Sequence, residues 1–311
     1  MKLVSVIMPA YNASKFIRKA IDSIINQTYS HFELLITDDL STDATRKIID
    51  SYNDPRIKTF HNEKNLGYLE TFNKLIALTK GDLITFQDAD DFSEPNRLEL
   101  LLEEFEKDGT LGICGSNFVR IDEKDRQIEI SDFPLVHDEI FGGMPEKFGF
   151  IGSALMIKRE VYEQTGGYHT FFNRMGQEDH YWGYLAMSRF KTKNIQPPLY
   201  FYRFNSSSVS GNLSNNPDKL NSQKIIETLI NQRKEKGTDL LEEGKDVELR
   251  KMLDVLNQPF YKDTSYFYYY IAKQRFYEGK KKIALKNMLR AIRENPQKMS
   301  YYKDFLYFLK K

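Results

Sequence analysis

The chain has 311 residues, 41% of them hydrophobic and 14% aromatic, which is enough to bury the core of one large domain or of a domain with an appendage. Its formal net charge of +1 lacks the basic excess typical of nucleic-acid-binding proteins, so we expect no nucleic-acid partner. The single cysteine, Cys114, excludes an internal disulfide and a multi-cysteine zinc site, and we interpret it as a buried thiol.

The first half of the chain alternates short apolar runs with longer amphipathic ones, the pattern of a sheet with crossover helices. Strands are predicted at 3–9, 32–39, 57–62, 82–87 and 111–119, and helices at 13–27, 41–52, 68–80 and 95–109. This β-α-β order predicts an α/β fold with a mostly parallel sheet covered by helices on both faces.

From about residue 216 the pattern is helical and polar, so we predict a main domain over 1–215 and a helical extension over 216–311. Residues 271–311 hold twelve Lys or Arg and three acidic residues, a net charge of +9, which leaves −8 for the rest. Two interpretations stay open for this basic segment: peripheral contact with an anionic membrane, or a helical hairpin packed on the main domain or on another copy of the chain.

No apolar run reaches the length of a membrane span, and the apolar start of the chain is too short for a signal peptide. We therefore expect a cytoplasmic protein. If the basic segment binds membrane, the protein would lie at its inner face.

Polar residues follow each of the first four predicted strands, at 9–12, 38–39, 62–65 and 88–91. Ligands bind outside the carboxyl ends of the strands in doubly wound sheets, so these loops are predicted to converge on one site. The first loop has no Gly-x-Gly-x-x-Gly pattern, and the chain has no Walker-type phosphate loop. A nucleotide would therefore not be held by a glycine cradle.

Asp88 and Asp90 are two residues apart, so in an extended segment both side chains would point the same way. Carboxylates so placed suit Mg²⁺ or Mn²⁺, bound through one or two side chains and completed by a substrate's phosphates. The alternative is that acidic residues here only favour the start of the next helix. We favour that alternative for Glu94, leave it open for Asp91 and disfavour it for Asp88 and Asp90, which precede the helix.

Several stretches resemble the motifs of family 2 glycosyltransferases of the GT-A fold: "VSVIMPAYNASKFIRKAIDSIINQTYSHFELLITDDLSTD", "NLGYLETFN", "DLITFQDADDFSEPNRL", "GGY" and "GQEDHYW". They extend over about two thirds of the chain. The resemblance implies a GT-A, Rossmann-like sheet with a nucleotide-sugar half at 1–110 and an acceptor half at 111–215. It also implies inverting transfer of a hexosyl or N-acetylhexosaminyl group from a nucleotide sugar, which we expect to be a UDP-sugar. The acceptor would be a hydroxyl of a glycan or lipid-linked molecule in surface polysaccharide biosynthesis.

The resemblance also assigns roles to residues. The base of the nucleotide would contact Pro9, Ala10 and Tyr11, and Asp39 would accept a hydrogen bond from the uracil or the ribose. Asp88 would face the ribose and diphosphate and share the Mn²⁺ or Mg²⁺ ion with Asp90. The remaining candidates for donor binding are Asn12, Asn65, Gly67, Ala89 and Arg203.

Inverting transfer needs one general base to take the proton of the acceptor hydroxyl. The resemblance assigns this role to Asp179 of "GQEDHYW", with Glu178 as its neighbour. The alternative is that both acids only favour the first turn of a helix.

The chain departs from the family pattern at two points. Asn205 stands where a His is common, so Arg203 or Ser207 could hold the phosphates instead. Phe72 stands where relatives often have an Arg, directly before Asn73 of "NLGYLETFN". The absence of a Gln-x-x-Arg-Trp motif argues against a processive polymerase.

Two other functions fit the sequence less well than sugar transfer. A sugar nucleotidyltransferase would need a glycine-rich, basic loop after the first strand, and "PAYNAS" is not one. A non-catalytic sugar-nucleotide-binding or scaffold protein would not need the combination of Asp39, Asp88, Asp90 and Asp179.

Overall fold

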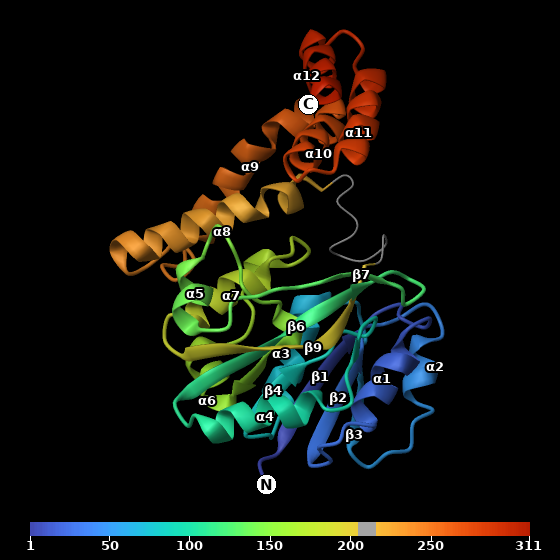
Figure 1. Cartoon of the computed structure of the whole chain (residues 1–311), viewed down its shortest axis with the longest axis vertical. Helices are drawn as coiled ribbons and strands as arrows, with labels where there is room; N and C mark the ends of the chain where they lie inside the picture. Colours follow the sequence, from blue (N-terminus) through green and yellow to red (C-terminus); the bar gives the residue numbers. More distant parts are fainter. Residues whose placement is uncertain (205–215) are drawn as a thin grey trace. The chain divides into compact units, whose positions relative to one another are not determined.

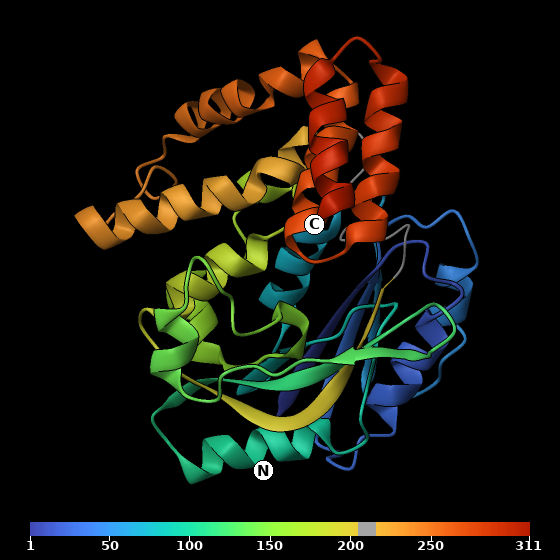
Figure 2. The same cartoon turned by 45° about the horizontal axis from the view of Figure 1, so that its top comes forward.

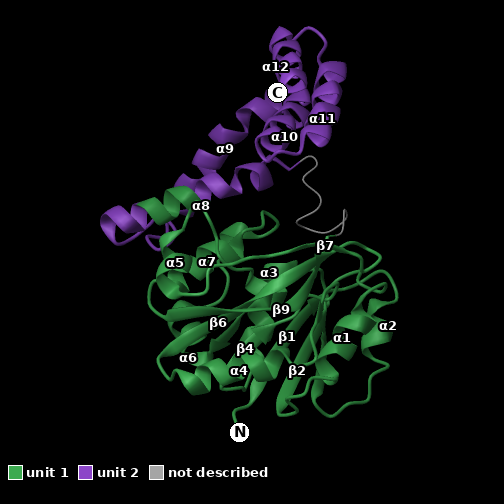
Figure 3. Ribbon diagram, in the orientation of Figure 1, with its two compact units in different colours: residues 1–212, 226–231 green, residues 213–225, 232–311 purple. Residues whose placement is uncertain are grey.

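The computed structural model describes residues 1–204 and 216–311. The chain divides into two compact units, the first comprising residues 1–212 and 226–231 and the second residues 213–225 and 232–311 (Figure 3). The domain boundary expected between residues 215 and 216 lies at the edge of the undescribed segment and stays a prediction.

The first unit contains a parallel group of four strands (Figure 1). These are β1 (Val4–Ala10), β2 (Phe32–Asp38), β3 (Ile57–His61) and β4 (Leu83–Phe86), in the order β3-β2-β1-β4. The first four strands predicted from the sequence are confirmed. Because the strands are parallel, all four carboxyl ends lie at one edge of the sheet.

Antiparallel pairs extend this group into a nine-stranded mixed sheet. β8 (Met156–Lys158) lies antiparallel between β4 and β6 (Leu111–Ile121), and β6 runs parallel to β9 (Lys191–Arg203). The short strands β5 (Phe92–Ser93) and β7 (Gln127–Ile130) pair antiparallel with β9 and β6. β9 therefore ends beside the loop that follows β4.

Helices cover both faces of the sheet, as predicted. On one face α1 (Ile17–Ile25), α2 (Thr45–Ile49) and α4 (Arg97–Lys107) pack on alternate strand residues such as Met8 and Leu34 (Figures 1 and 2). α3 (Tyr68–Leu78) contacts β1 and β2 from the opposite face. The remaining short elements of this unit are α5 (His137–Gly142), η1 (Gly152–Ala154), α6 (Arg159–Thr165), η2 (Thr170–Phe172) and α7 (Glu178–Met187).

The rest of the chain is helical, as the sequence predicts. The helices are α8 (Pro217–Lys236), α9 (Asp246–Lys262), α10 (Ser265–Tyr277), α11 (Lys281–Glu294) and α12 (Met299–Lys310). The last three share a core of three alanines, one methionine and two aromatic residues: Ala272, Ala284, Met288, Ala291, Tyr301 and Phe308. None of the described helices has both the length and the apolar composition needed to cross a membrane.

Candidate active site

Of the three residues predicted to contact the base of the nucleotide, Pro9, Ala10 and Tyr11, only Tyr11 has an exposed side chain. Pro9 and Ala10 end the buried strand, whereas Tyr11 is 50% exposed. Asn12 adopts a left-handed backbone with φ of 49° and accepts a hydrogen bond from the Thr42 N–H at 2.8 Å. The loops after β1 and β2 are therefore joined, and Tyr11 has a ring free to stack on a planar group.

Asp39, after β2, fixes the loop between β3 and α3. Its buried carboxylate accepts hydrogen bonds from the N–H groups of Leu66 and Gly67 at 2.9 and 2.8 Å and from the Asn62 amide at 2.8 Å. The Asn65 side chain donates to the Asp39 carbonyl at 3.0 Å. The predicted contact of Asp39 with a uracil or ribose stays a prediction, and the observed contacts give this residue a structural role as well.

Two of the quoted motifs meet through Asn73 and Tyr168. The Asn73 side chain donates to the Tyr168 carbonyl and accepts from the Tyr168 N–H, each at 2.8 Å. A Cβ atom at Gly167 would lie 2.2 Å from the Asn73 Oδ1 atom, so only glycine allows this approach. Phe72, the departure noted in the sequence, stacks on the Tyr168 ring with 4.1 Å between the centroids.

Asp88 follows β4 and lies near two other acidic side chains, Asp90 and Asp179. Its carboxylate accepts a hydrogen bond from the Tyr68 hydroxyl at 3.2 Å, and its N–H donates to the Tyr200 hydroxyl at 3.0 Å. Burial, followed by the charge of Asp90 and then that of Asp179, raises the pKa of Asp88 to about 7, although hydrogen bonds from Tyr68 and Ser153 oppose the change. The donor-side and base candidates are thus close enough to affect one another electrostatically.

Asp90 and Asp91 have different environments, with the buried Ala89 preceding them. Asp91 is buried, and its Oδ1 atom accepts a hydrogen bond from the Arg203 N–H at 2.7 Å. The half-buried Asp90 carboxylate receives no hydrogen bond from any other described residue, while burial raises its pKa. Among the described residues, the structure therefore gives Asp91 a structural contact and leaves the Asp90 oxygens available to a ligand.

Asp179 lies in the first turn of α7. Its Oδ2 atom accepts a hydrogen bond from the Gly152 N–H at 3.2 Å, and a Cβ atom at Gly152 would lie only 2.9 Å from that of Asp179. The half-buried Glu178 precedes Asp179 in the same turn. The ring of the following residue, His180, stacks on the Phe148 ring with 3.8 Å between the centroids. The Gly152 N–H thus orients the Asp179 carboxylate, and the Asp179 side chain remains only half-buried.

Arg97 is a buried cation near the acidic loop at residues 88–91, and it was not among the site residues predicted from the sequence. Its guanidinium donates to the carbonyls of Phe86 and Ser153 at 3.1 and 2.8 Å and to the Ser93 hydroxyl at 3.0 Å. Burial lowers its pKa to about 10, so it remains charged at neutral pH, and the acidic side chains of Asp88 and Asp91 favour that state. The sequence did contain one signal for this role: Arg97 lies on the apolar face of the predicted helix that follows Asp88, Asp90 and Asp91.

Arg203 ends β9 and is also buried. Its Nε atom donates to the Asp90 carbonyl at 2.7 Å, and its Nη1 atom lies 2.5 Å from the Asp125 carboxylate. Its predicted contact with phosphate stays a prediction. The other two residues considered in this segment, Asn205 and Ser207, lie outside the described residues.

The side chains present fit a cation only in combination with a substrate. Within residues 1–204 and 216–311, no group of three or more His, Cys, Asp or Glu side chains is arranged to hold a metal ion. Asp90 and Asp88 could supply one or two carboxylates, and Mg²⁺ is commonly bound in this way when a substrate's phosphates complete the coordination.

Asp88→Asn is expected to stabilise the metal-free protein at pH 8. An acid whose pKa is about 7 in the folded state, against an ordinary pKa of 3.8, costs stability progressively as the pH rises between these values, because the unfolded chain ionises more readily. Relative to pH 5, the variant should gain on the order of 2–4 kcal/mol over the wild type at pH 8. Urea denaturation in excess chelator measures this difference.

The exposed Asp132 provides the matched control, since Asp132→Asn should show no such pH-dependent gain. Equal stability differences at pH 5 and pH 8 for the Asp88 variant would contradict the expected ionisation of Asp88.

Comparison with known proteins gives consistent results. Residues 5–166 match the family described as Glycosyl transferase family 2. The chain is similar to an uncharacterised glycosyltransferase of Haemophilus influenzae, 33% identical over 172 residues, and spans about half of that relative's length (52% of this chain, 53% of the relative). It is also similar to the putative teichuronic acid biosynthesis glycosyltransferase TuaG of Bacillus subtilis, 32% identical over 216 residues (68% of this chain, 82% of the relative).

Among solved structures, the fold is similar to residues 1–349 of S. aureus TarS in complex with UDP. The TM-score is 0.58 at 15% sequence identity, with 92% of this chain and 81% of that chain covered. The family match extends over more than half of the sequence and includes the strand-edge loops described above. This chain therefore belongs to glycosyltransferase family 2.

Proposed function

We propose that the protein is an inverting, metal-dependent glycosyltransferase that moves a hexosyl or N-acetylhexosaminyl group from a UDP-sugar to a hydroxyl of a glycan or lipid-linked acceptor. The observation that carries this proposal is the available Asp90 carboxylate beside Asp88, with Asp179 near enough to raise the pKa of Asp88. A role in surface polysaccharide biosynthesis is supported by the similarity to TuaG, named for teichuronic acid biosynthesis, and UDP as the nucleotide by the TarS complex.

The donor would lie across the carboxyl edge of β1, β2 and β4. Tyr11 would stack on the base, with the backbone of Pro9 and Ala10 beside it, and Asp39 would accept from the uracil or ribose while holding Gly67 and Asn65 in place. Asn12 and Ala89 would shape the loops around the nucleotide. This assignment uses side chains and backbone rather than a glycine cradle, as the sequence predicts.

Asp90, with Asp88, would hold Mn²⁺ or Mg²⁺ against the diphosphate. Such an ion, when bound, neutralises phosphate charge and stabilises the departing UDP. Asp88 must lose its proton to act as a ligand, and the ion's positive charge favours that loss.

Asp179 would accept the proton of the acceptor hydroxyl as that oxygen attacks the anomeric carbon. The new bond joins the acceptor oxygen to this carbon, the bond from the carbon to the diphosphate oxygen breaks, and UDP leaves from the opposite side with its electron pair. The Gly152 N–H holds one oxygen of Asp179, and the other is bonded to the N–H of His180.

Asp90→Asn should lower the affinity for UDP in the presence of Mn²⁺ by about tenfold or more, because it removes a ligand charge from the ion that links protein and diphosphate. Calorimetric titration of UDP with Mn²⁺ and with excess chelator measures both the affinity and its dependence on metal. The same titrations should be unaffected by Asp132→Asn, which alters an exposed acid of the same unit.

Wild-type UDP binding that persists unchanged in chelator would sink the metal-dependent function. Unchanged UDP affinity in the Asp90 variant would instead reject Asp90 alone. Release of UDP from a panel of UDP-sugars, with and without Mn²⁺, then identifies the donor.

We also retain the proposal that the basic residues of 271–311 contact an anionic membrane at the cytoplasmic face. The apolar side of α11 supports only part of it, because Met288 is buried in the helical core, whereas Leu289 is 51% exposed among basic residues. A membrane contact would thus use the outer side of α11 and α12, where Leu306 and Lys303 are also exposed. Packing on the main domain or on another copy of the chain remains the alternative.

A further inference from the structure

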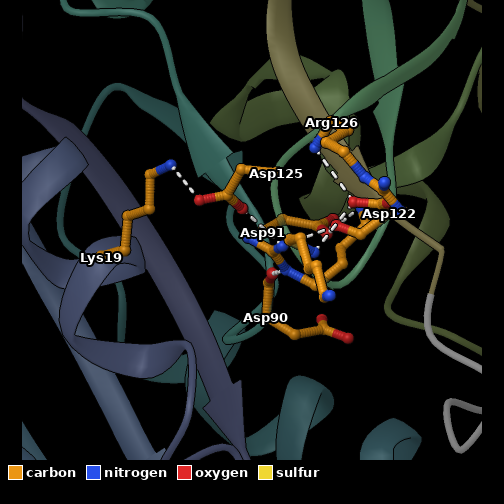
Figure 4. Close-up of polar contacts among 8 residues, drawn as sticks. Lys19, Asp90, Asp91, Asp122, Asp125 and Arg126 are labelled. Carbon is orange, nitrogen blue, oxygen red and sulfur yellow. Dashed lines mark hydrogen bonds and ion pairs between the residues drawn. The ribbon is translucent and has the colours of Figure 1, made fainter.

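The Arg203 guanidinium connects the loop at Asp90 to the turn between β6 and β7. Its Nε atom donates to the Asp90 carbonyl at 2.7 Å, and its Nη1 atom donates to the Asp122 carbonyl at 2.9 Å and pairs with Asp125 at 2.5 Å (Figure 4). The Arg203 backbone N–H binds the Asp91 side chain at 2.7 Å. Arg203 therefore holds residues 90 and 91 at two points, the backbone of Asp90 and the side chain of Asp91.

The turn at residues 122–126 is held by its own hydrogen bonds. The Asp122 carboxylate accepts from the N–H groups of Lys124 and Arg126 at 2.9 and 3.0 Å and forms an ion pair with the Arg126 side chain at 2.6 Å. Asp125 has a left-handed backbone with φ of 62°, and its N–H donates to the Asp122 carbonyl at 3.0 Å. The turn therefore presents the Asp125 carboxylate to Arg203 from a fixed backbone.

Lys19 of α1 binds the other oxygen of the same carboxylate. Its Nζ atom lies 2.8 Å from Asp125 Oδ2 and 3.5 Å from the centre of the Phe92 ring, two residues after Asp90. Asp125 thus sits between two cations, Lys19 and Arg203, and Figure 4 shows the Lys19 side chain directed at the Asp125 carboxylate. Lys19 and Asp125 are both partly exposed, whereas Arg203 is only 2% exposed.

We propose that Asp125 is a positioning residue for the metal ligand Asp90, keeping the buried Arg203 guanidinium on the Asp90 carbonyl and away from the Asp90 carboxylate. This inference rests on the proposed function. A buried guanidinium needs a compensating charge, and Asp125 provides it. Without that charge, Arg203 would turn to the nearby Asp90 carboxylate, which no other described residue engages through a hydrogen bond, and would compete there with the cation.

Asp125→Asn should therefore raise the Mn²⁺ concentration needed for half-maximal UDP binding by about tenfold, the size expected when a residue that orients a metal ligand is lost. Saturating Mn²⁺ should restore UDP affinity, because the ion then outcompetes Arg203. Calorimetry and the electron paramagnetic resonance signal of free Mn²⁺ provide two readouts that do not require turnover.

The matched control is Arg126→Gln, which breaks the Asp122–Arg126 ion pair in the same turn without removing a group that contacts Arg203. Its half-saturating Mn²⁺ concentration should equal that of the wild type. The double variant Asp125→Asn/Arg203→Gln distinguishes competition from a purely structural role, because removal of the Arg203 charge should return the half-saturating Mn²⁺ concentration toward the wild-type value.

The inference is overturned if Asp125→Asn leaves Mn²⁺ dependence unchanged, or if the double variant needs more Mn²⁺ than the single one. Both results assume metal-dependent UDP binding by the wild-type protein, which is measured first with Mn²⁺ and UDP alone. A wild type that binds UDP independently of Mn²⁺ would reject the proposed function, and this inference with it.

Discussion

Asp179→Asn is expected to lower the rate of sugar transfer by about 10²- to 10⁴-fold, the contribution typical of general base catalysis. The loss should appear in kcat, because the amide cannot accept the acceptor's proton but can keep the hydrogen bond from the Gly152 N–H. UDP and Mn²⁺ binding should stay close to wild type, since the side chain is assigned to the acceptor side. Calorimetry of UDP binding followed by transfer to the true acceptor measures both effects.

Glu178→Gln is the matched control, because it makes the same chemical change at the adjacent residue of the same helical turn. It should cost less than the Asp179 change, since Glu178 is expected to tune or orient its neighbour. A dead Glu178 variant with an active Asp179 variant would reverse the two roles. Two active variants would place the base elsewhere and reject the assignment to "GQEDHYW".

The parallel half of the sheet was predictable because each of its strands is a short apolar run that ends in polar residues. β1 to β4 lie within one or two residues of their predicted limits. The helices were predicted too long: α1 begins at Ile17 rather than at 13, because the Ala13 carbonyl accepts from the N–H groups of Phe16 and Ile17 in a turn. Sequence periodicity finds the apolar face of a helix, but local hydrogen bonds decide where the helix begins.

Of the strands added to this half, β6 was predicted at 111–119, whereas β5, β7, β8 and β9 were not, for two physical reasons. β5, β7 and β8 contain only two to four residues, too few to show alternation. β9 is long, but Pro197 and Pro198 lack the N–H groups of a regular ladder, and the register with β6 shifts beside them. β9 nevertheless brings Tyr200 and Arg203 to the acidic loop.

The candidate site was predictable where chemistry follows directly from strand ends. Asp88 and Asp90 were identified because charges that follow a buried strand need a ligand or a partner. The partner groups come from distant segments: Arg97 reaches the Ser153 carbonyl, and Gly152 reaches Asp179. Sequence spacing cannot indicate such contacts, since they depend on how α4, η1 and α7 pack.

Arg97→Met is expected to destabilise the protein by about 3–5 kcal/mol, the range for removing one partner of a buried charged network. Methionine fills much of the volume but leaves the carbonyls of Phe86 and Ser153 and the Thr85 hydroxyl without their donor. It also removes the buried positive charge near Asp88 and Asp91, so the stability loss should be larger at pH 8 than at pH 5. Urea denaturation of the metal-free protein at both pH values measures the loss.

Arg46 supplies an exposed comparison: its ion pair with Asp50 is solvent-accessible, so Arg46→Met should change stability by less than about 1 kcal/mol. Combining Arg97→Met with Asp88→Asn should cost less than the sum of the separate changes, because the acid that most needs the cation is then neutral. Additive losses would mean that Arg97 acts only through its hydrogen bonds. An Arg97 variant as stable as wild type would show that the acidic loop needs no cation behind it, and the electrostatic account of this site would fail.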